Sequence, residues 1–294
     1  MNEGISILQW NCRGIYRKIF EFKRYLSTLN TILDLLILQE THLIERYSPK
    51  IQGYDLIRKD NTLHSGGLAI FAKDNLRTVI LNTPGTTNTE LQCIRVHNLS
   101  IYNIYIPPDR RLDIQELAFM SNLPKHAIIA GDFNAHHHVW SSSDNPLSNK
   151  RGQNIFEAID KNRLIILNSS SPTRINLAAN AVNRWSLLDL TLATPDVAYK
   201  CSTVVTDQLI GSDHFAIITT INNRVVRSEP QPKKWSLARA NWNKFSRLVD
   251  TQLANKTFGV ESIDEMNYEI TNFLISATEK SIPRSRNVGK KPIP

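Results

Sequence analysis

Carboxylate, amide, phenol and imidazole side chains follow short apolar runs at six places in the sequence. These residues are Asn11, Glu40, Tyr105, Asp132, Asn134, Asp189, Asp213 and His214. Glu40, Asp132 and Asp213 offer hard oxygen ligands without a thiolate cluster, which favours Mg²⁺ over Zn²⁺. A histidine beside Asp213, with a second carboxylate available to orient its ring, suits the cleavage of a phosphate ester.

Each of these segments also has an ordinary structural explanation when it is taken alone. A glutamate after a strand is most often solvated, residues 131–134 fit an Asx turn, and an Asp-His pair can cap a strand. The six segments nevertheless occur in a fixed order at predicted strand ends. Loops at the rim of a rigid sheet are where active sites concentrate. Their joint occurrence therefore predicts a catalytic site.

The elements that must position these residues are short strands with helices between them. Helical spacing of apolar residues predicts helices at 16–29, 112–123 and 152–162. Apolar runs bounded by turn residues predict strands at 5–10, 33–38, 66–72, 76–81, 91–96, 99–106, 126–131, 164–167, 187–192, 201–207 and 215–221. This α/β pattern predicts two packed sheets flanked by helices.

The amino-acid composition changes after residue 221. Residues 222–240 are polar and contain prolines, which is typical of a linker. Residues 241–294 hold two amphipathic helical patterns, the second opened by a capping box of Ser262 and Glu265, and then a basic, proline-rich end. The helices fit either a hairpin that docks on the body or a neighbour, or a DNA-binding arm.

The charge of the chain is unevenly distributed. Residues 1–221 carry a net charge of +2 and residues 222–294 a net charge of +6, within a total of +8 over 294 residues. A basic chain suggests a nucleic-acid partner without saying which part binds it. Three distant cysteines exclude a disulfide framework, and no secretory signal or apolar run long enough for a membrane span is present. We expect a soluble intracellular protein.

The motif series resembles the endonuclease/exonuclease/phosphatase family. It comprises QWN (9–11), LQETH (38–42), YIPP (105–108), GDFN (131–134), SLLDLTL (186–192) and SDH (212–214). Within that family, GGLAIF (66–71), GDFNAHHHVWSS (131–142), RG (151–152), ILNSSSPTR (166–174) and LDLTLATP (188–195) are similar to the apurinic-type endonuclease domain of insect-type non-LTR retrotransposons. The resemblance covers most of residues 5–221, and the tail is similar to the segment that leads to the reverse transcriptase.

The resemblance implies a four-layer α/β/β/α sandwich of two mixed sheets with outer helices, followed by a helical C-terminal extension. It implies that Glu40, with Asn11 and Asp213, binds Mg²⁺, for which Mn²⁺ can substitute. Asp132 would orient or deprotonate the attacking water and Asn134 would hold it. His214, oriented by Asp189, would donate to the scissile phosphate, as would the Tyr105 hydroxyl.

Two polar segments have competing interpretations. Residues 136–138 are three histidines, and we expect a surface or DNA-facing loop over Trp140 rather than a zinc site, with the adjacent rings pointing apart. Residues 174–185 are either a plain hairpin or, as the family implies, a hairpin that enters the minor groove of DNA. The DNA-binding residues expected are Arg13, His42, Arg174, Asn180, Asn183 and Arg184.

The function implied is nicking of double-stranded target DNA to leave a 3′-hydroxyl that primes reverse transcription in retrotransposition. The partners expected are a reverse transcriptase domain in cis and the element RNA, with no membrane and a nuclear site of action. An apurinic-site repair endonuclease or another phosphodiesterase on the same fold is the first alternative. A non-catalytic DNA-binding module is the second.

Overall fold

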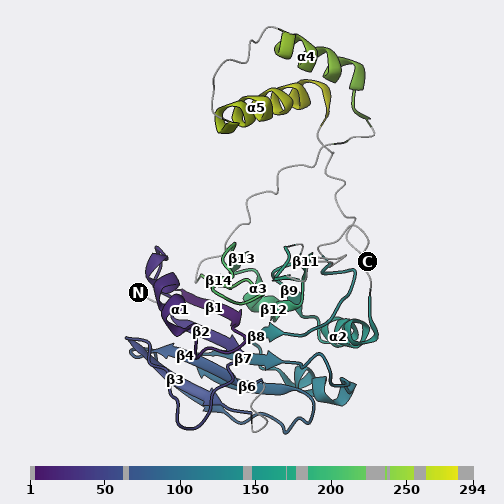
Figure 1. Cartoon of the computed structure of the whole chain (residues 1–294). Coiled ribbons are helices and arrows are strands. Elements are labelled where there is room, and N and C mark those ends of the chain that lie inside the picture. The colour runs from purple at the N-terminus through teal and green to yellow at the C-terminus, as the bar shows by residue number, and fades with distance from the viewer. Residues whose placement is uncertain are drawn as a thin grey trace. The chain divides into compact units, whose positions relative to one another are not determined.

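The chain is divided into two compact units, Met1–Val226 and Arg227–Pro294. The structure is a computed structural model that describes residues 4–61, 66–141, 148–169, 171–176, 185–222, 236, 239–254 and 263–283. Figure 1 shows the first unit as two sheets with helices outside them and the second as a pair of helices.

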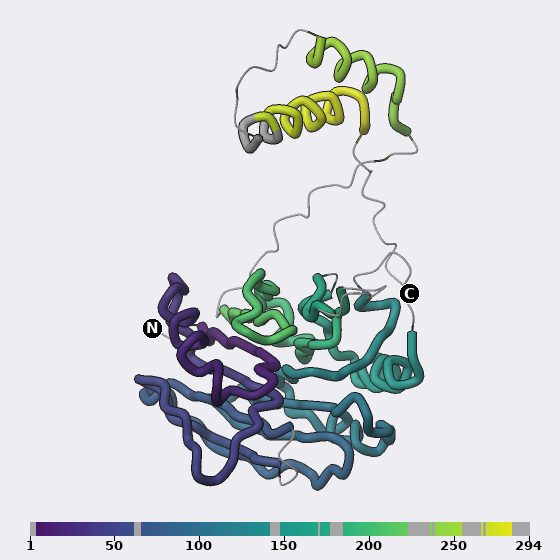
Figure 2. The backbone as a smooth tube through the Cα atoms, in the orientation of Figure 1, coloured from purple at the N-terminus to yellow at the C-terminus, as the bar shows by residue number. Residues whose placement is uncertain are grey.

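Sheet A holds six strands in the order β13-β14-β1-β2-β4-β3. Their bounds are β13 Cys201–Val205, β14 Ile217–Ile221, β1 Ile5–Asn11, β2 Leu35–Gln39, β4 Leu68–Lys73 and β3 Tyr54–Lys59. β1 and β2 run parallel, and every other pair is antiparallel. β1, the first strand of the chain, therefore lies beside β14, one of the last, as the tube in Figure 2 shows.

Sheet B holds six strands in the order β5-β6-β7-β8-β12-β9. Their bounds are β5 Thr78–Leu81, β6 Glu90–Val96, β7 Leu99–Tyr105, β8 Ala127–Asp132, β12 Asp189–Ala193 and β9 Ile165–Ile166. β7 and β8 are the parallel pair in this sheet. A short hairpin of β10 (Arg174–Ile175) and β11 (Trp185–Ser186) stands apart from both sheets.

The central strands are mainly apolar because both of their faces are buried. In β1, Leu8 and Trp10 join a core cluster with Phe22 of α1 (Ile19–Thr28), whereas Ile7 joins a cluster between the sheets with Ile101. A third cluster lies under η1 (Ile114–Asn122) and α2 (Lys150–Lys161), outside sheet B. These layers confirm the sandwich predicted from the sequence.

The second unit is a helical hairpin. α4 (Trp242–Ala254) and α5 (Ile263–Ser281) pack against each other, and Trp242 stacks edge-to-face on Phe245. Ala277 and Ile282 are buried, whereas Trp242, Leu274 and Ile275 remain exposed. The C-terminal helical extension is therefore confirmed, and most of the predicted linker lies outside the described residues.

Local structure departs from the sequence predictions in three places. The segment predicted as a helix at 112–123 is the 3₁₀ helix η1, with the Asp113 side chain accepting a hydrogen bond from Gln115 N at its start. Strand β3 was not predicted, because its half-buried residues show no clean alternation. The short helix α3 (Pro195–Ala198), which begins with a proline, was not predicted either.

Candidate active site

The two sheets deliver the predicted polar residues to one rim. β1 and β2 are parallel and end at Asn11 and Gln39, so Asn11 and Glu40 emerge together. In sheet B, Asp132 at the end of β8 pairs directly with Asp189 at the start of the antiparallel β12. His214 precedes β14, which is antiparallel to β1, and so returns to the same rim.

His214 lies between two buried carboxylates. Its Nδ1 is 2.8 Å from Asp189 Oδ2, and its Nε2 is 3.9 Å from Asp132 Oδ2. Burial disfavours the charged imidazole, but the adjacent Asp189 and Asp132 carboxylates outweigh burial and raise the pKa of His214 to about 9. Burial and the nearby Asp189 charge also raise the pKa of Asp132. The arrangement holds a proton donor beside a carboxylate able to accept one.

Asn11 connects the two halves of the site. Its Nδ2 donates to Glu40 Oε1 at 2.9 Å and to Asp132 Oδ2 at 2.8 Å, which joins sheet A to sheet B at the rim. Burial alone would raise the pKa of Glu40, but hydrogen bonds from His42, Asn11 and Tyr105 lower it to about 2. Glu40 is therefore held as a carboxylate, partly exposed, beside the buried Asp132.

Several of these residues sit in the left-handed backbone region. Arg13, Glu40, His42 and Asn134 have φ angles of 45°, 48°, 50° and 45°. Non-glycine residues adopt this region at a cost of order 1–3 kcal/mol, and such residues cluster at functional sites. The left-handed conformation of Glu40 and Asn134 shows that the loops after β2 and β8 are held in place by the residues around them.

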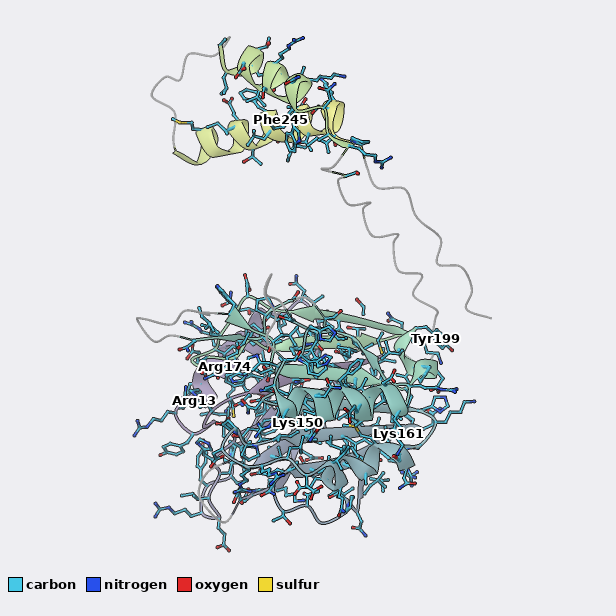
Figure 3. The ribbon with its side chains drawn as sticks, turned by 90° about the vertical axis from the view of Figure 1, so that its right-hand side faces the viewer. Arg13, Lys150, Lys161, Arg174, Tyr199 and Phe245 are labelled. Atoms are coloured by element: carbon cyan, nitrogen blue, oxygen red, sulfur yellow. The ribbon has the colours of Figure 1, made fainter. Side chains whose placement is uncertain are left out.

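Asp213 is engaged by two guanidinium groups. Its Oδ2 is 3.2 Å from Arg13 Nη1 and 2.9 Å from Arg174 Nη2. Burial would raise the pKa of Asp213, but His214 and Arg174, with Arg13, lower it. Figure 3 shows Arg13 and Arg174 at the same edge of the unit, with Tyr199 at the opposite edge. Two of the predicted DNA-binding residues are thus brought to the candidate site.

His42 lies beside Glu40, with 3.6 Å between its Nε2 and Glu40 Oε2. The remaining three predicted DNA-binding residues, Asn180, Asn183 and Arg184, lie outside the described residues, as does most of the predicted hairpin. The described part of that hairpin, β10 and β11, places Arg174 opposite His214 through an isolated bridge.

Further residues beside the predicted catalytic side chains hold those side chains in place. Thr173 Oγ1 accepts hydrogen bonds from the backbone nitrogens of Leu188 and Asp189, each at 3.0 Å. Ser212 Oγ donates to Asn11 O at 2.8 Å, and Trp10 Nε1 donates to His214 O at 3.1 Å. Thr173 and Ser212 lie within the motifs ILNSSSPTR and SDH. The motifs therefore pointed to these residues, but they did not indicate which hydrogen bonds the residues make.

Beneath the rim, buried amides join the sheets. Gln9 Nε2 donates to Gly131 O at 3.0 Å, and Thr191 Oγ1 donates to Gln9 Oε1 at 3.0 Å. Gln39 Nε2 donates to Asn103 Oδ1 at 2.7 Å, and Asn103 Nδ2 donates to Leu38 O at 3.1 Å. Directional bonds of this kind fix the register of one sheet on the other, which apolar packing alone would leave less defined.

The histidine run differs from the prediction. His137 is 1% exposed and packs in the core, with its ring 4.5 Å from that of Phe156 and 4.9 Å from that of Trp140. The rings of His137 and His138 lie 4.2 Å apart, so they do not point apart. The prediction of a surface loop was wrong for His137, because its ring fills a space between α2 and the buried Trp140.

The donor set suits a hard divalent cation. The carboxylates of Asp132 and Asp189 lie around His214, with ligand atoms of the three residues within 4.8 Å of one another, and Asn11 joins Glu40 to Asp132. Asp189 Oδ1 and Asp213 Oδ1 are buried and have no hydrogen-bond partner among the described residues. The nearby Cys12 thiol donates to Gln39 O, and burial raises its pKa to about 12, so it supplies no thiolate. Carboxylate oxygens without a thiolate fit a hard divalent cation better than Zn²⁺.

Residues 99–218 match the family described as endonuclease-reverse transcriptase. The matched segment runs from the start of β7 into β14. It contains Tyr105, Asp132, Asn134, Asp189, Asp213 and His214, six of the eight predicted catalytic residues.

Individual proteins agree with this match. The chain is 24% identical over 303 residues to a probable RNA-directed DNA polymerase from transposon X-element of Drosophila melanogaster, covering 99% of this chain and 32% of that relative. It therefore spans about a third of the relative's length.

Two solved structures share the fold. The endonuclease domain of TRAS1, a telomere-specific non-LTR retrotransposon, superposes with a TM-score of 0.60 at 21% identity, over 74% of this chain and 98% of that domain. An AP endonuclease from Archaeoglobus fulgidus gives 0.60 at 17% identity, over 74% and 99%. These two matches confirm the α/β/β/α sandwich fold predicted from the sequence. In the part of the chain that the structure describes, no helix is long and apolar enough to cross a membrane.

Proposed function

We propose that this chain is a DNA endonuclease that nicks double-stranded target DNA and leaves a 3′-hydroxyl, which primes reverse transcription. The observation that carries the proposal is the placement of His214 between Asp189 and Asp132, beside the Glu40–Asn11 pair. The matched endonuclease–reverse transcriptase family and the retrotransposon relatives support DNA as the substrate.

The reaction forms a bond between a water oxygen and phosphorus while the bond from phosphorus to the 3′ oxygen breaks. Asp132 accepts the proton of the water, and its raised pKa makes it a better base than an ordinary carboxylate. Asn134 Nδ2, 3.0 Å from Asp132 Oδ2, fixes the direction in which that carboxylate faces. The departing 3′ oxygen takes a proton from solvent water to give the hydroxyl.

His214 stabilises the charge that grows on the phosphate oxygens. Asp189 accepts the hydrogen bond from Nδ1, so that Nε2 carries the proton that faces the reacting group. The Tyr105 hydroxyl, which donates to Glu40 in this structure, would turn to the phosphate as a second donor, and burial with the adjacent Glu40 and Asp132 carboxylates raises its pKa and keeps it protonated. Donors fixed in advance are worth more in such a buried site than in water.

Glu40 would hold a divalent metal ion, Mg²⁺ or Mn²⁺, with Asn11 and Asp213 as the neighbouring donors. Such an ion supplies neutralisation of the phosphate charge. Glu40 suits that role because its lowered pKa keeps it ionised. Of the two carboxylates that Asn11 contacts, Glu40 is also more exposed than Asp132. Arg13, Arg174 and His42 would contact the DNA backbone from the same rim.

The relative that the chain matches is about three times longer, which supports a reverse transcriptase domain in cis and element RNA as a partner. The helical extension, with the basic end that follows it, would then connect the nuclease to that domain. Target-primed reverse transcription takes place on chromosomal DNA, and we therefore place the site of action in the nucleus.

Nicking of supercoiled plasmid in Mg²⁺ or Mn²⁺ tests the proposal. We expect open-circular product whose ends a DNA polymerase can extend, and loss of product for His214→Ala and Asp132→Asn. His126→Ala is a matched control, because His126 precedes β8, at the opposite end of that strand from Asp132, and pairs with Asp196 of α3 at 3.1 Å. Folded wild-type protein that leaves plasmid intact in both metals would remove the proposal. A strong preference for abasic over intact duplex would favour a repair endonuclease instead.

A further inference from the structure

The RG motif at residues 151–152 lies at the first turn of α2, outside the residues to which the mechanism assigns a role. Its surroundings are two loops that follow strands of sheet B. One is the catalytic loop, residues 131–138, which begins with the last two residues of β8 and contains Asp132 and Asn134. The other is the proline loop, residues 107–110, which follows Tyr105 at the end of β7.

The Arg151 guanidinium joins these two loops. Its Nη1 donates to Asn134 O at 3.1 Å, in the catalytic loop. Its Nη2 donates to Pro107 O at 3.0 Å and Pro108 O at 3.1 Å, and also to Arg110 O. A planar fork with five donors can span several carbonyls at once, which a point-like ammonium cannot.

The rest of the first turn of α2 holds the same catalytic loop. Asn149 N donates to His136 O at 3.0 Å, and the Asn149 side chain caps the helix through Gly152 N at 2.7 Å. A Cβ at residue 152 would collide with His136 O, so only glycine lets the helix approach this closely. The Arg-Gly pair is therefore shaped to receive the backbone of the catalytic loop.

Asn134 needs such support. It has a left-handed φ of 45°, and its side chain donates both to Asp132 Oδ2 at 3.0 Å and to Ile106 O at 3.1 Å. These bonds tie the carboxylate to the segment that carries the proline loop. If the loops move apart, the amide loses one of its two acceptors and no longer fixes its side of the carboxylate, which then keeps only the donor from Asn11 on that oxygen.

We propose that Arg151 is a positioning residue for the nicking reaction, which braces the proline loop against the catalytic loop and so fixes Asn134 on Asp132. The proposal rests on the proposed function. Arg151 acts through the backbone and does not contact the reacting atoms. Its removal should therefore lower kcat with little change in KM, since misplacement of a catalytic group by about 1 Å can cost about 100-fold in rate.

The test compares Arg151→Ala and Arg151→Lys with Lys150→Ala in the full chain. Lys150 is the exposed neighbour on the same helix turn, so its variant removes a cation without removing a carbonyl contact. We expect kcat for nicking to fall about 10- to 100-fold in both Arg151 variants, with KM within about threefold of wild type. Millimolar guanidinium should restore part of kcat in Arg151→Ala and leave the other proteins unchanged.

A second readout makes the result independent of the proposed function. Amide hydrogen exchange in residues 132–138 should accelerate in the Arg151 variants and stay at the wild-type rate in Lys150→Ala. If exchange accelerates in the Arg151 variants but the wild-type protein does not nick DNA, the positioning role of Arg151 is supported and the proposed nuclease function is contradicted. Unchanged exchange, wild-type kcat, or a loss confined to KM would overturn the brace. If Arg151→Ala does not fold, Arg151→Lys decides, because it keeps the charge and loses the fork.

Discussion

His214 and Asp189 come from different sheets, and the 2.8 Å between His214 Nδ1 and Asp189 Oδ2 joins those sheets at the active-site rim. Asn11 makes the corresponding connection on the other side, from β1 to Asp132. The site therefore depends on how one sheet packs on the other.

Asp189→Asn should keep the fold and lose most of the nicking activity. The amide is nearly isosteric, but it no longer selects the tautomer of His214 or stabilises its charged ring. By analogy with serine hydrolase triads, kcat should fall by about 10²- to 10⁴-fold. Plasmid nicking at saturating DNA measures this effect. Asp196→Asn is the matched control, because it alters the His126–Asp196 pair and should leave kcat unchanged. Equal rates for both variants would contradict the role of Asp189.

The stability of the nuclease unit should fall as the pH rises from about 6.5 to about 9. His214 has its pKa raised from 6.5 to about 9, so the folded protein binds this proton more tightly than the unfolded chain. The resulting stabilisation is fully present below about pH 6.5 and is lost as the pH rises through about 9. Its upper limit is on the order of 3 kcal/mol.

Chemical denaturation of wild type and His214→Gln at several pH values measures this change. The difference in unfolding free energy between the two proteins should shrink across that interval. A difference independent of pH would show that His214 does not hold its proton more tightly in the folded state.

Gly131→Ala should prevent correct folding. A Cβ at this position would collide with Ile104 O on the adjacent strand β7, where backbone cannot move without breaking the β7–β8 ladder. We expect a loss of more than about 3 kcal/mol, as for severe overpacking. Thermal unfolding and soluble yield report it. Gly85→Ala is the control, because nothing lies within 4 Å of its Cβ position, and it should be neutral or slightly stabilising.

The buried amides Gln39 and Asn103 should be strongly coupled. Gln39→Leu or Asn103→Leu leaves the other amide buried without its partner, which costs about 1–3 kcal/mol. The double variant should cost less than the sum of the single variants, with a coupling of about 1–2 kcal/mol. Urea unfolding of the four proteins gives this cycle. The exposed Gln153–Glu157 pair, whose side chains are 3.0 Å apart, should give a coupling below about 0.5 kcal/mol. Additive losses at Gln39 and Asn103 would show that the inter-sheet bond contributes little.

The sequence by itself determined which residues gather at the rim. Apolar runs are recognisable when a strand is buried on both faces, as in residues 33–38, and polar residues at their ends, such as Glu40 and Asp132, follow from local pattern. The half-buried strand β3 has no such apolar run or clean alternation, and the sequence pattern therefore does not predict it. The helix predicted at 112–123 became 3₁₀, since apolar spacing indicates a buried face without distinguishing the two hydrogen-bond patterns.

Only the tertiary structure decided how these residues meet. The contacts of His214 with Asp189, of Asn11 with Asp132 and of Arg151 with Asn134 each join segments 17 to 121 residues apart. Spacing along the chain carries no information about such distances. His137 illustrates the same limit, since its neighbours suggested a surface loop and the packing of Phe156 and Trp140 buried it. Local pattern fixes which face of an element is buried, whereas long-range packing fixes which buried groups become partners.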